Sequence, residues 1–209
     1  MNVLRGLWAK SRALQASDKW IFGTMLVSAS LSLLAALVLS IESLALAKNP
    51  EAALSCSVNA VINCASVMRH PTADLFGFPN SFIGLMTEPV VITVAIAGLA
   101  GVRFPRAFMA AAQVGYFLGL VFAYWLFFVS VFTIGALCPW CLLVTVSTTA
   151  VFASLLRYNI REDNLYAPRR LQTILRRWVD KDYDKFAVAV VLFAMALLVL
   201  AKYGNGLFA

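Results

Sequence analysis

Long blocks of hydrophobic residues, separated by short polar segments, dominate this chain. Ile21–Ile41 is one uncharged block, and Phe82–Val102 is a second one, interrupted by Glu88 and Pro89. Each block has about the 20 residues that an α-helix needs to cross the hydrocarbon core of a bilayer. We therefore predict one membrane span in each of these two blocks.

The longest block, Ala107–Leu156, contains no charged residue over 50 positions. A single helix of that length would measure about 75 Å, more than twice the thickness of a hydrocarbon core. The block must therefore fold back, and its strongest helix breakers lie at Gly135–Pro139. We predict spans over Phe108–Ile134 and Cys138–Leu156, joined by a turn at those breakers, and a fifth span over Phe186–Ala201.

The composition agrees with a membrane protein, since 62% of the residues are hydrophobic and only 13% are charged. A soluble domain has about 25% charged residues, so this chain cannot cover a water-facing surface. We predict an all-α integral membrane protein, with a four-helix transmembrane bundle plus a fifth transmembrane helix. The first block is too long, and begins too far along the chain, for a cleavable signal peptide.

Lysine and arginine are distributed unevenly between the predicted connections. Fourteen lie before the first span, after the second span and after the fourth span, and only Lys48, Arg69 and Lys202 lie elsewhere. Because cytoplasmic loops are enriched in these residues, we predict a cytoplasmic N-terminus in the inner (cytoplasmic) cell membrane. The net charge of +7 then reflects topology and does not indicate nucleic-acid binding. The basic connection 157–185 is expected to be partly helical and to contact anionic lipid.

All four cysteines fall on the predicted outer side of the membrane. Cys56 and Cys64 lie in the loop 48–80, and Cys138 and Cys141 form a CxxC motif that opens the fourth span. A CxxC is the spacing of a redox-active dithiol, and a helix N-terminus lowers the pKa of a thiol. We predict that the two pairs exchange electrons, because the outer compartment permits disulfides. The alternatives are a structural disulfide in the loop and a pair of inert cysteines in the helix.

This order of parts resembles the bacterial form of the vitamin K epoxide reductase family over about the first 160 residues. The segment Asn80–Gly84 is also similar to that family's motif at the entry to the second span. The resemblance implies that residues 1–156 form a redox bundle around a quinone, either menaquinone or ubiquinone. Residues 157–209 would form the basic cytoplasmic connection and the fifth helix. Many bacterial members continue into a thioredoxin-like domain, whereas this chain ends at Ala209, so a separate DsbA-like thioredoxin-fold partner is expected.

The resemblance also implies a role for each site residue of a thiol:quinone oxidoreductase that supports disulfide formation in secreted proteins. The reduced partner would attack the loop disulfide at Cys56, and Cys64 would then attack Cys138. Cys141 would pass the electrons to the quinone, and Asn80 would hydrogen-bond the quinone. A second role for Asn80, as the N-cap of the second span, remains open.

Two positions depart from the family's usual pattern. Arg69 and His70 stand near the place of a serine that usually follows the second loop cysteine, and Thr145 stands near the place of a tyrosine. We expect His70 to be a polar loop residue rather than a proton carrier. No zinc site is expected, because the chain has a single histidine and lacks zinc-ligand spacings.

Four further residues have candidate structural or functional roles. Glu88, inside the second span, could relay a proton to the quinone, but we favour a protonated carboxyl group near the outer interface, bonded to a neighbouring helix. Glu42 is expected at the outer membrane interface. Gly115 and Gly119 form a GxxxG motif, which predicts close helix packing.

The competing function is a non-enzymatic transporter or assembly protein with structural disulfides. Such a protein is expected to have polar residues along several spans, or internal repeats, and neither is evident in the sequence.

Overall fold

The computed structural model describes residues 18–52 and 54–207. Five helices in these ranges are long and apolar enough to span a membrane. They are α2 (Asp18–Lys48), α4 (Ser81–Leu99), α5 (Arg106–Val129) with its π-helical extension η2 (Ser130–Ile134), α6 (Pro139–Arg161) and α8 (Tyr183–Leu207). The connections contain α3 (Cys64–Met68), η1 (Pro71–Asp74) and α7 (Arg169–Asp180). The five predicted spans are confirmed, and α2 extends further than its apolar block, as far as Lys48.

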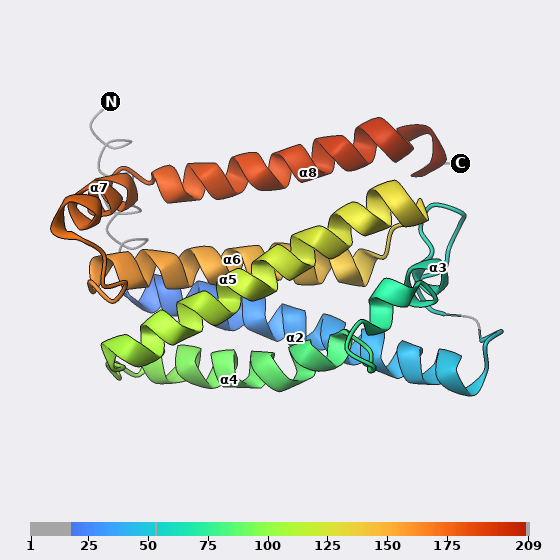
Figure 1. Cartoon of the computed structure of the whole chain (residues 1–209), viewed down its shortest axis with the longest axis horizontal. Coiled ribbons are helices and arrows are strands. Elements are labelled where there is room, and N and C mark those ends of the chain that lie inside the picture. Colours follow the sequence, from blue (N-terminus) through green and yellow to red (C-terminus); the bar gives the residue numbers. More distant parts are fainter. Residues whose placement is uncertain (1–17, 53, 208–209) are drawn as a thin grey trace, which may run out of the picture.

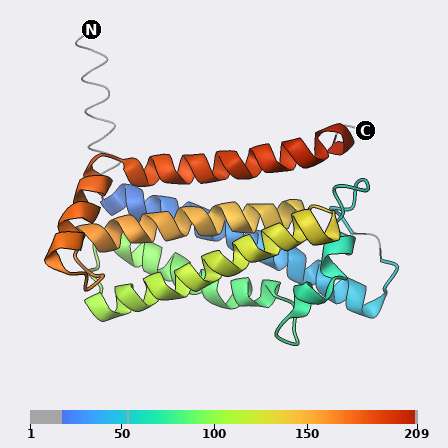
Figure 2. The same cartoon turned by 45° about the horizontal axis from the view of Figure 1, so that its top comes forward.

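The helices α2, α4, α5 and α6 form the bundle, and α8 runs alongside it (Figures 1 and 2). Within the bundle, α2 packs against both α4 and α6, and α5 packs against α6. The fifth long helix, α8, contacts α6 and is joined to it through α7 at one end of the molecule. The predicted architecture of four helices plus one is therefore confirmed.

Small residues on α4 allow it to approach α2 closely. A Cβ atom added at Gly98 would lie 2.5 Å from the ring of Phe22, which is itself buried in the core. Gly84 meets α2 in the same way. The prediction for Gly115 and Gly119 is wrong, because a Cβ atom at either position would meet nothing within 4 Å. Close packing therefore occurs between α2 and α4 and does not involve the GxxxG motif of α5.

The predicted turn between the third and fourth spans lies where the glycine and proline breakers indicate. The last turn of the third span widens into the π-helix, and Gly135 follows with a φ of +75°, a left-handed conformation that glycine adopts without strain. Pro139 then occupies the first turn of α6, where its missing N–H costs no hydrogen bond. The carbonyl of Val131 accepts hydrogen bonds from Lys202 Nζ (2.6 Å) and Tyr203 Oη (2.8 Å), which ties the end of α8 to this turn.

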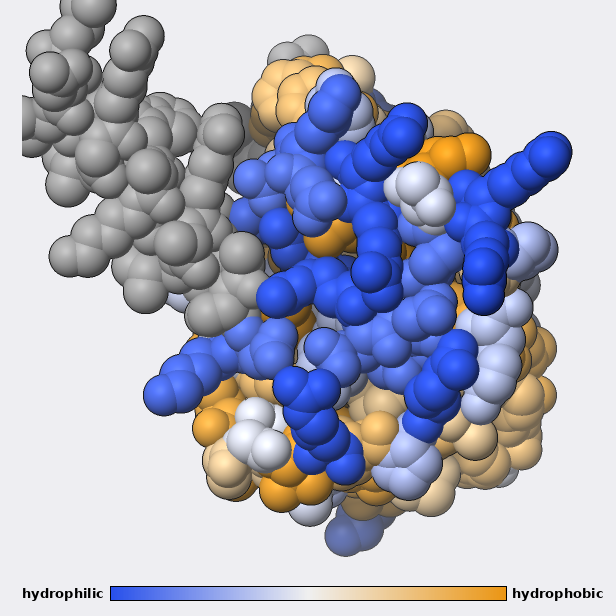
Figure 3. All heavy atoms as spheres, turned by 90° about the vertical axis from the view of Figure 1, so that its left-hand side faces the viewer, coloured by the Kyte–Doolittle hydropathy of each residue, from blue (hydrophilic) through white to orange (hydrophobic). Residues whose placement is uncertain are grey.

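The segments rich in lysine and arginine lie before the first span and after the second and fourth spans. They are at the opposite end of the bundle from the turn between η2 and α6 (Figure 1). Arg103 lies 3.0 Å from Glu162, and Arg161 lies 3.3 Å from Asp18, so the connection after α6 contacts both the connection after α4 and the start of α2. Figure 3 shows hydrophilic side chains across this end, bordered by apolar ones. The N-terminal cations of the orientation count, Arg5, Lys10 and Arg12, lie outside the described residues.

The connection 157–185 is partly helical, as predicted. Its helix α7 has an apolar face, of which Leu171, Ile174 and Trp178 are about half exposed. Beside it, the guanidinium of Arg157 is buried and lies 2.9 Å from both Asp182 and Asp184. This ion-pair network fixes the start of α8 to the end of α6.

Candidate redox site

The first cysteine pair lies in the loop between α2 and α4. Cys56 and Cys64 form a disulfide with a Cα–Cα distance of 5.6 Å. Cys64 is the first residue of α3, and Asn63 caps that helix by accepting a hydrogen bond from the Ser66 N–H (3.0 Å). Both cysteines are buried, with 6% of Cys56 and none of Cys64 exposed. The loop therefore folds over its own disulfide.

A single parallel β-bridge, between Ile62 and Leu137, fastens this loop to the turn before α6. The backbone N–H of Asn63 donates to the Leu137 carbonyl (3.0 Å), and the Leu137 N–H donates to the Val61 carbonyl (2.7 Å). Leu137 immediately precedes Cys138, so the bridge sets the distance between the two cysteine pairs. The loop between α2 and α4 and the turn before α6 thus bring the two cysteine pairs together.

Cys138 is the N-cap residue of α6, and its Sγ accepts a hydrogen bond from the Cys141 N–H at 3.4 Å. The pKa of the Cys138 thiol is lowered, chiefly because the Cys141 thiol donates a hydrogen bond to its sulfur. Burial and the charge of Glu42 act in the opposite direction, while the N–H groups of Cys141 and Trp140 add to the lowering. Cys138 is therefore suited to act as the thiolate of the CxxC motif.

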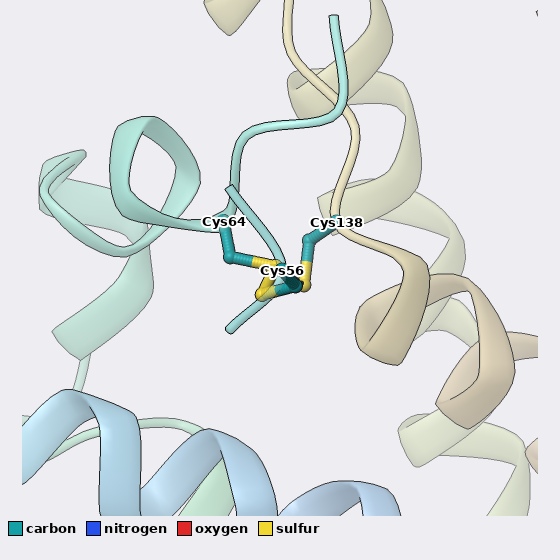
Figure 4. Close-up of side chains that lie close together, drawn as sticks. All are labelled: Cys56, Cys64 and Cys138. Atoms are coloured by element: carbon teal, nitrogen blue, oxygen red, sulfur yellow. Dashed lines mark hydrogen bonds between the residues drawn. A yellow bond between two sulfur atoms is a disulfide. The ribbon is translucent and has the colours of Figure 1, made fainter. Parts of the chain in front are cut away.

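Figure 4 shows Cys138 beside the disulfide that joins Cys56 and Cys64. The Sγ atoms of Cys64 and Cys138 are 3.1 Å apart, and those of Cys56, Cys64 and Cys138 all lie within 4.8 Å of one another. Cys138 and Cys141 are free thiols, the first buried and the second half-buried. Three sulfurs at this spacing could also ligate a metal ion, but two of them are joined as a disulfide, and a metal needs thiolates. The arrangement as described favours thiol–disulfide exchange.

Glu42, which the sequence leads us to expect at the outer membrane interface, is buried within the protein. Its side chain is 8% exposed, because α2 continues beyond it and the loop folds back over it. Its Oε1 accepts hydrogen bonds from the backbone N–H of Ser55 (3.0 Å) and from the Ser55 hydroxyl, and its Oε2 lies 3.3 Å from Cys56 Sγ. The sequence shows Glu42 only as a single carboxylate in an apolar run. Its contacts with Ser55 and Cys56 depend on the fold of the loop, which that pattern does not reveal.

Asn80 stands at the N-cap position of α4, yet its side chain makes no capping hydrogen bond, so the capping hypothesis is wrong. Its Nδ2 donates instead to the carbonyl of Thr72 at 2.6 Å. Its Oδ1 is buried and has no hydrogen-bond partner within the described chain. A buried acceptor without a donor carries an energetic cost, which a ligand with a hydroxyl group would relieve.

A family model described as the vitamin K epoxide reductase family matches residues 24–156. The chain belongs to the vitamin K epoxide reductase family. The matched residues include all four cysteines, the whole of α4 and α5, and most of α2 and α6. A search of curated proteins finds no match. After residue 156 the described chain contains only the end of α6, α7 and α8.

Family membership makes this chain a multi-pass membrane thiol oxidoreductase. Its departures from the family pattern have local structural roles. The His70 ring pairs with the Thr72 hydroxyl (Nδ1···Oγ1 2.9 Å), as expected of a polar loop residue. The Thr145 hydroxyl, near the position where family members can have a tyrosine, donates to the Cys141 carbonyl at 2.9 Å.

Glu88 lies inside the bundle and is bonded to two neighbouring helices. Its carboxylate accepts hydrogen bonds from Ser32 on α2 (2.7 Å) and from Tyr116 on α5 (2.9 Å). These contacts agree with the favoured interpretation of Glu88 as a carboxyl group bonded to its neighbours.

Proposed function

We propose that this protein is a thiol:quinone oxidoreductase that supports disulfide bond formation in secreted proteins. Electrons would pass from a DsbA-like thioredoxin-fold partner to Cys56 and Cys64, then to Cys138 and Cys141, and finally to a membrane quinone. The observation that supports this proposal most directly is the 3.1 Å separation between the Sγ atoms of Cys64 and Cys138. Thiol–disulfide exchange requires such contact between an attacking sulfur and a disulfide sulfur.

In the first step, a thiolate of the reduced partner attacks Cys56 Sγ and releases the Cys64 thiolate. The partner's second thiol then attacks its own bonded sulfur, which leaves an oxidised partner and reduced Cys56 and Cys64. Because Cys56 is only 6% exposed, the partner needs the loop segment over the disulfide to move aside. Val58, 74% exposed, lies in that segment and is available for the first contact.

The second step moves the electrons between the pairs. The Cys64 thiolate attacks Cys138 Sγ in an oxidised CxxC and releases the Cys141 thiolate. Cys56 then attacks Cys64 Sγ, which restores the loop disulfide and leaves Cys138 and Cys141 reduced. The described structure has this distribution, with an oxidised loop pair and two free thiols in the CxxC.

The surroundings of Asn80 and Cys141 suit a quinone. Cys141 is half-buried and packs beside Trp140 and Val144, and the unpartnered Asn80 Oδ1 could accept a hydrogen bond from a hydroquinone hydroxyl. A bound quinone would take up the two electrons and two protons of the reduced CxxC. Close to Asn80 in the chain, Phe78, Phe82, Leu85 and Met86 line a shallow apolar groove.

We further propose that residues 1–156 form the redox unit, and that residues 157–209 form a cytoplasmic connection and an anchoring helix. The gathering of basic residues at one end supports a cytoplasmic location for that end. The cysteines, at the opposite end, would then face the oxidising side of the inner (cytoplasmic) membrane.

The proposal is tested with the purified full chain in lipid nanodiscs that contain menaquinone or ubiquinone. A reduced DsbA-like protein is added, and quinone reduction and partner oxidation are followed together. The wild type should couple the two reactions in equal amounts, and Cys138→Ala and Cys141→Ala should reduce the rate to background. Glu51→Gln, at an exposed position of the same loop, is the matched control. Full activity of the Cys138→Ala protein would instead indicate structural disulfides.

A further inference from the structure

We propose that Glu42 exchanges a proton with the Cys56 thiol during turnover. This inference rests on the function proposed above and names a residue that acts on the loop pair. Glu42 lies on α2, and neither its position in the sequence nor its expected place at the interface pointed to this role. Its position against the loop disulfide carries the argument.

The two oxygens of the Glu42 carboxylate have different neighbours. Oε1 is occupied by the Ser55 N–H and the Ser55 hydroxyl, so it fixes the backbone just before Cys56. Oε2 lies 3.3 Å from Cys56 Sγ, within reach of a proton on that sulfur once the disulfide is reduced. One oxygen therefore positions the cysteine, and the other is free to take up or release a proton.

The surroundings of Glu42 favour a functional carboxylate over a structural ion pair. Its side chain is 8% exposed, and it forms no salt bridge with any residue in the described ranges. Burying a carboxylate without a neighbouring cation costs free energy, so a functional role would explain why a glutamate occupies this position. Two titratable groups face Glu42: Cys56, in the loop between α2 and α4, and Cys138, at the start of α6.

The proton moves twice in each cycle, in opposite directions. When the partner's disulfide closes, Cys56 is released as a thiolate and takes a proton from the Glu42 carboxyl. When Cys56 must later attack Cys64 in the Cys64–Cys138 mixed disulfide, the Glu42 carboxylate takes that proton back. The new Cys56–Cys64 bond then forms as the bond to Cys138 breaks, and the Cys138 thiolate leaves with the electron pair.

The test compares Glu42→Gln with the wild type in the nanodisc assay between pH 6 and pH 9.5. Glutamine keeps an oxygen that can accept from Ser55, but it cannot take a proton from Cys56. We expect the Glu42→Gln rate near pH 7 to fall by about 30-fold, because only about 3% of a thiol with a pKa of about 8.5 is ionised there without a base. At the highest pH the rate should approach that of the wild type, because a thiol with a pKa of about 8.5 ionises there without a base.

Glu51→Gln is the matched control, since Glu51 is an exposed carboxylate in the same loop; its pH profile should follow that of the wild type. Glu42→Ala, which also loses the contacts to Ser55, should be slow at every pH. A Glu42→Gln rate that equals the wild type, or that is reduced by the same factor at every pH, overturns the proton role. A wild type that reduces no quinone with any reduced partner overturns the proposed function itself.

Discussion

The Sγ atoms of Cys64 and Cys138 lie 3.1 Å apart, although the two residues are separated by 74 positions in the chain. Cys64 is held by its capped helix, and Cys138 is held as the N-cap of α6. The β-bridge between Ile62 and Leu137 joins the two supports. The contact is thus built into the fold, and it does not require any rearrangement of the membrane helices.

Substitution of Asn80 by alanine is expected to weaken quinone binding. The buried Oδ1 has no partner within the described chain, so its removal costs one hydrogen bond only when the ligand is bound. The substitution also removes the Nδ2 bond to the Thr72 carbonyl, but that loss is the same with and without quinone. We expect the quinone KM to rise about tenfold, which corresponds to the loss of one hydrogen bond of about 1.4 kcal/mol.

Transfer of electrons between the cysteine pairs, measured without quinone by thiol trapping, should stay unchanged in Asn80→Ala. Thr93→Ala is the control and should leave the quinone KM unchanged, because Thr93 is exposed on α4 and its hydroxyl donates to the Pro89 carbonyl of its own helix. A normal KM in Asn80→Ala would remove this residue from the quinone site.

Gly98→Ala is expected to destabilise the bundle. The added Cβ would lie 2.5 Å from the Phe22 ring, and overpacking of this kind costs about 1–3 kcal/mol. Gly115→Ala is the control, because its Cβ would meet nothing within 4 Å. Thermal unfolding in detergent should therefore show a lower Tm for Gly98→Ala alone. Equal effects of the two substitutions would contradict the packing described between α2 and α4.

These glycines also show how far the sequence can be interpreted. Hydropathy predicts all five spans, because the length of an apolar block reports the thickness of the membrane directly. It cannot show which glycine faces another helix, since Gly98 and Gly115 both lie in apolar blocks. That distinction depends on the rotation of each helix about its own axis, which is set by tertiary packing.

The candidate site could likewise be predicted only in part from the sequence. The cysteine spacing and the charge asymmetry together predict that both pairs lie at one end of the bundle. The burial of Glu42 could not be predicted, because it depends on how segment 54–56 folds back over α2. The free Oδ1 of Asn80 was equally hidden, since the Nδ2 of the same amide bonds to Thr72, eight residues away in the chain.

The junction between α6 and α8 is expected to loosen in acid. Burial acts to raise the pKa of the Asp182 carboxyl, but Lys185 and Arg157 outweigh it and hold the pKa below its usual range. A lowered pKa contributes stability that is complete above the unfolded-state value of about 4 and is lost as the pH falls through the lower folded-state value. Hydrogen exchange across residues 180–186 should therefore accelerate, relative to intrinsic rates, only below about pH 4.

Asp182→Asn should weaken this acid dependence, since only the Asp184 pair with Arg157 remains, and give faster exchange at neutral pH as well. Asp180→Asn, at an exposed position two residues earlier, should behave like the wild type. A pH profile that is identical in Asp182→Asn and the wild type would show that the ion pairs of Arg157 do not stabilise this junction.

The contact between Cys64 and Cys138 is tested most directly by removing their partners. In a Cys56→Ser/Cys141→Ser variant only these two cysteines remain, and mild oxidation in nanodiscs should join them in nearly every molecule, as measured by mass spectrometry of the linked peptides. The reciprocal variant Cys64→Ser/Cys138→Ser keeps only Cys56 and Cys141 and should form little or no disulfide. Absence of the Cys64–Cys138 bond, or equal cross-linking of both variants, would contradict the proposed electron route.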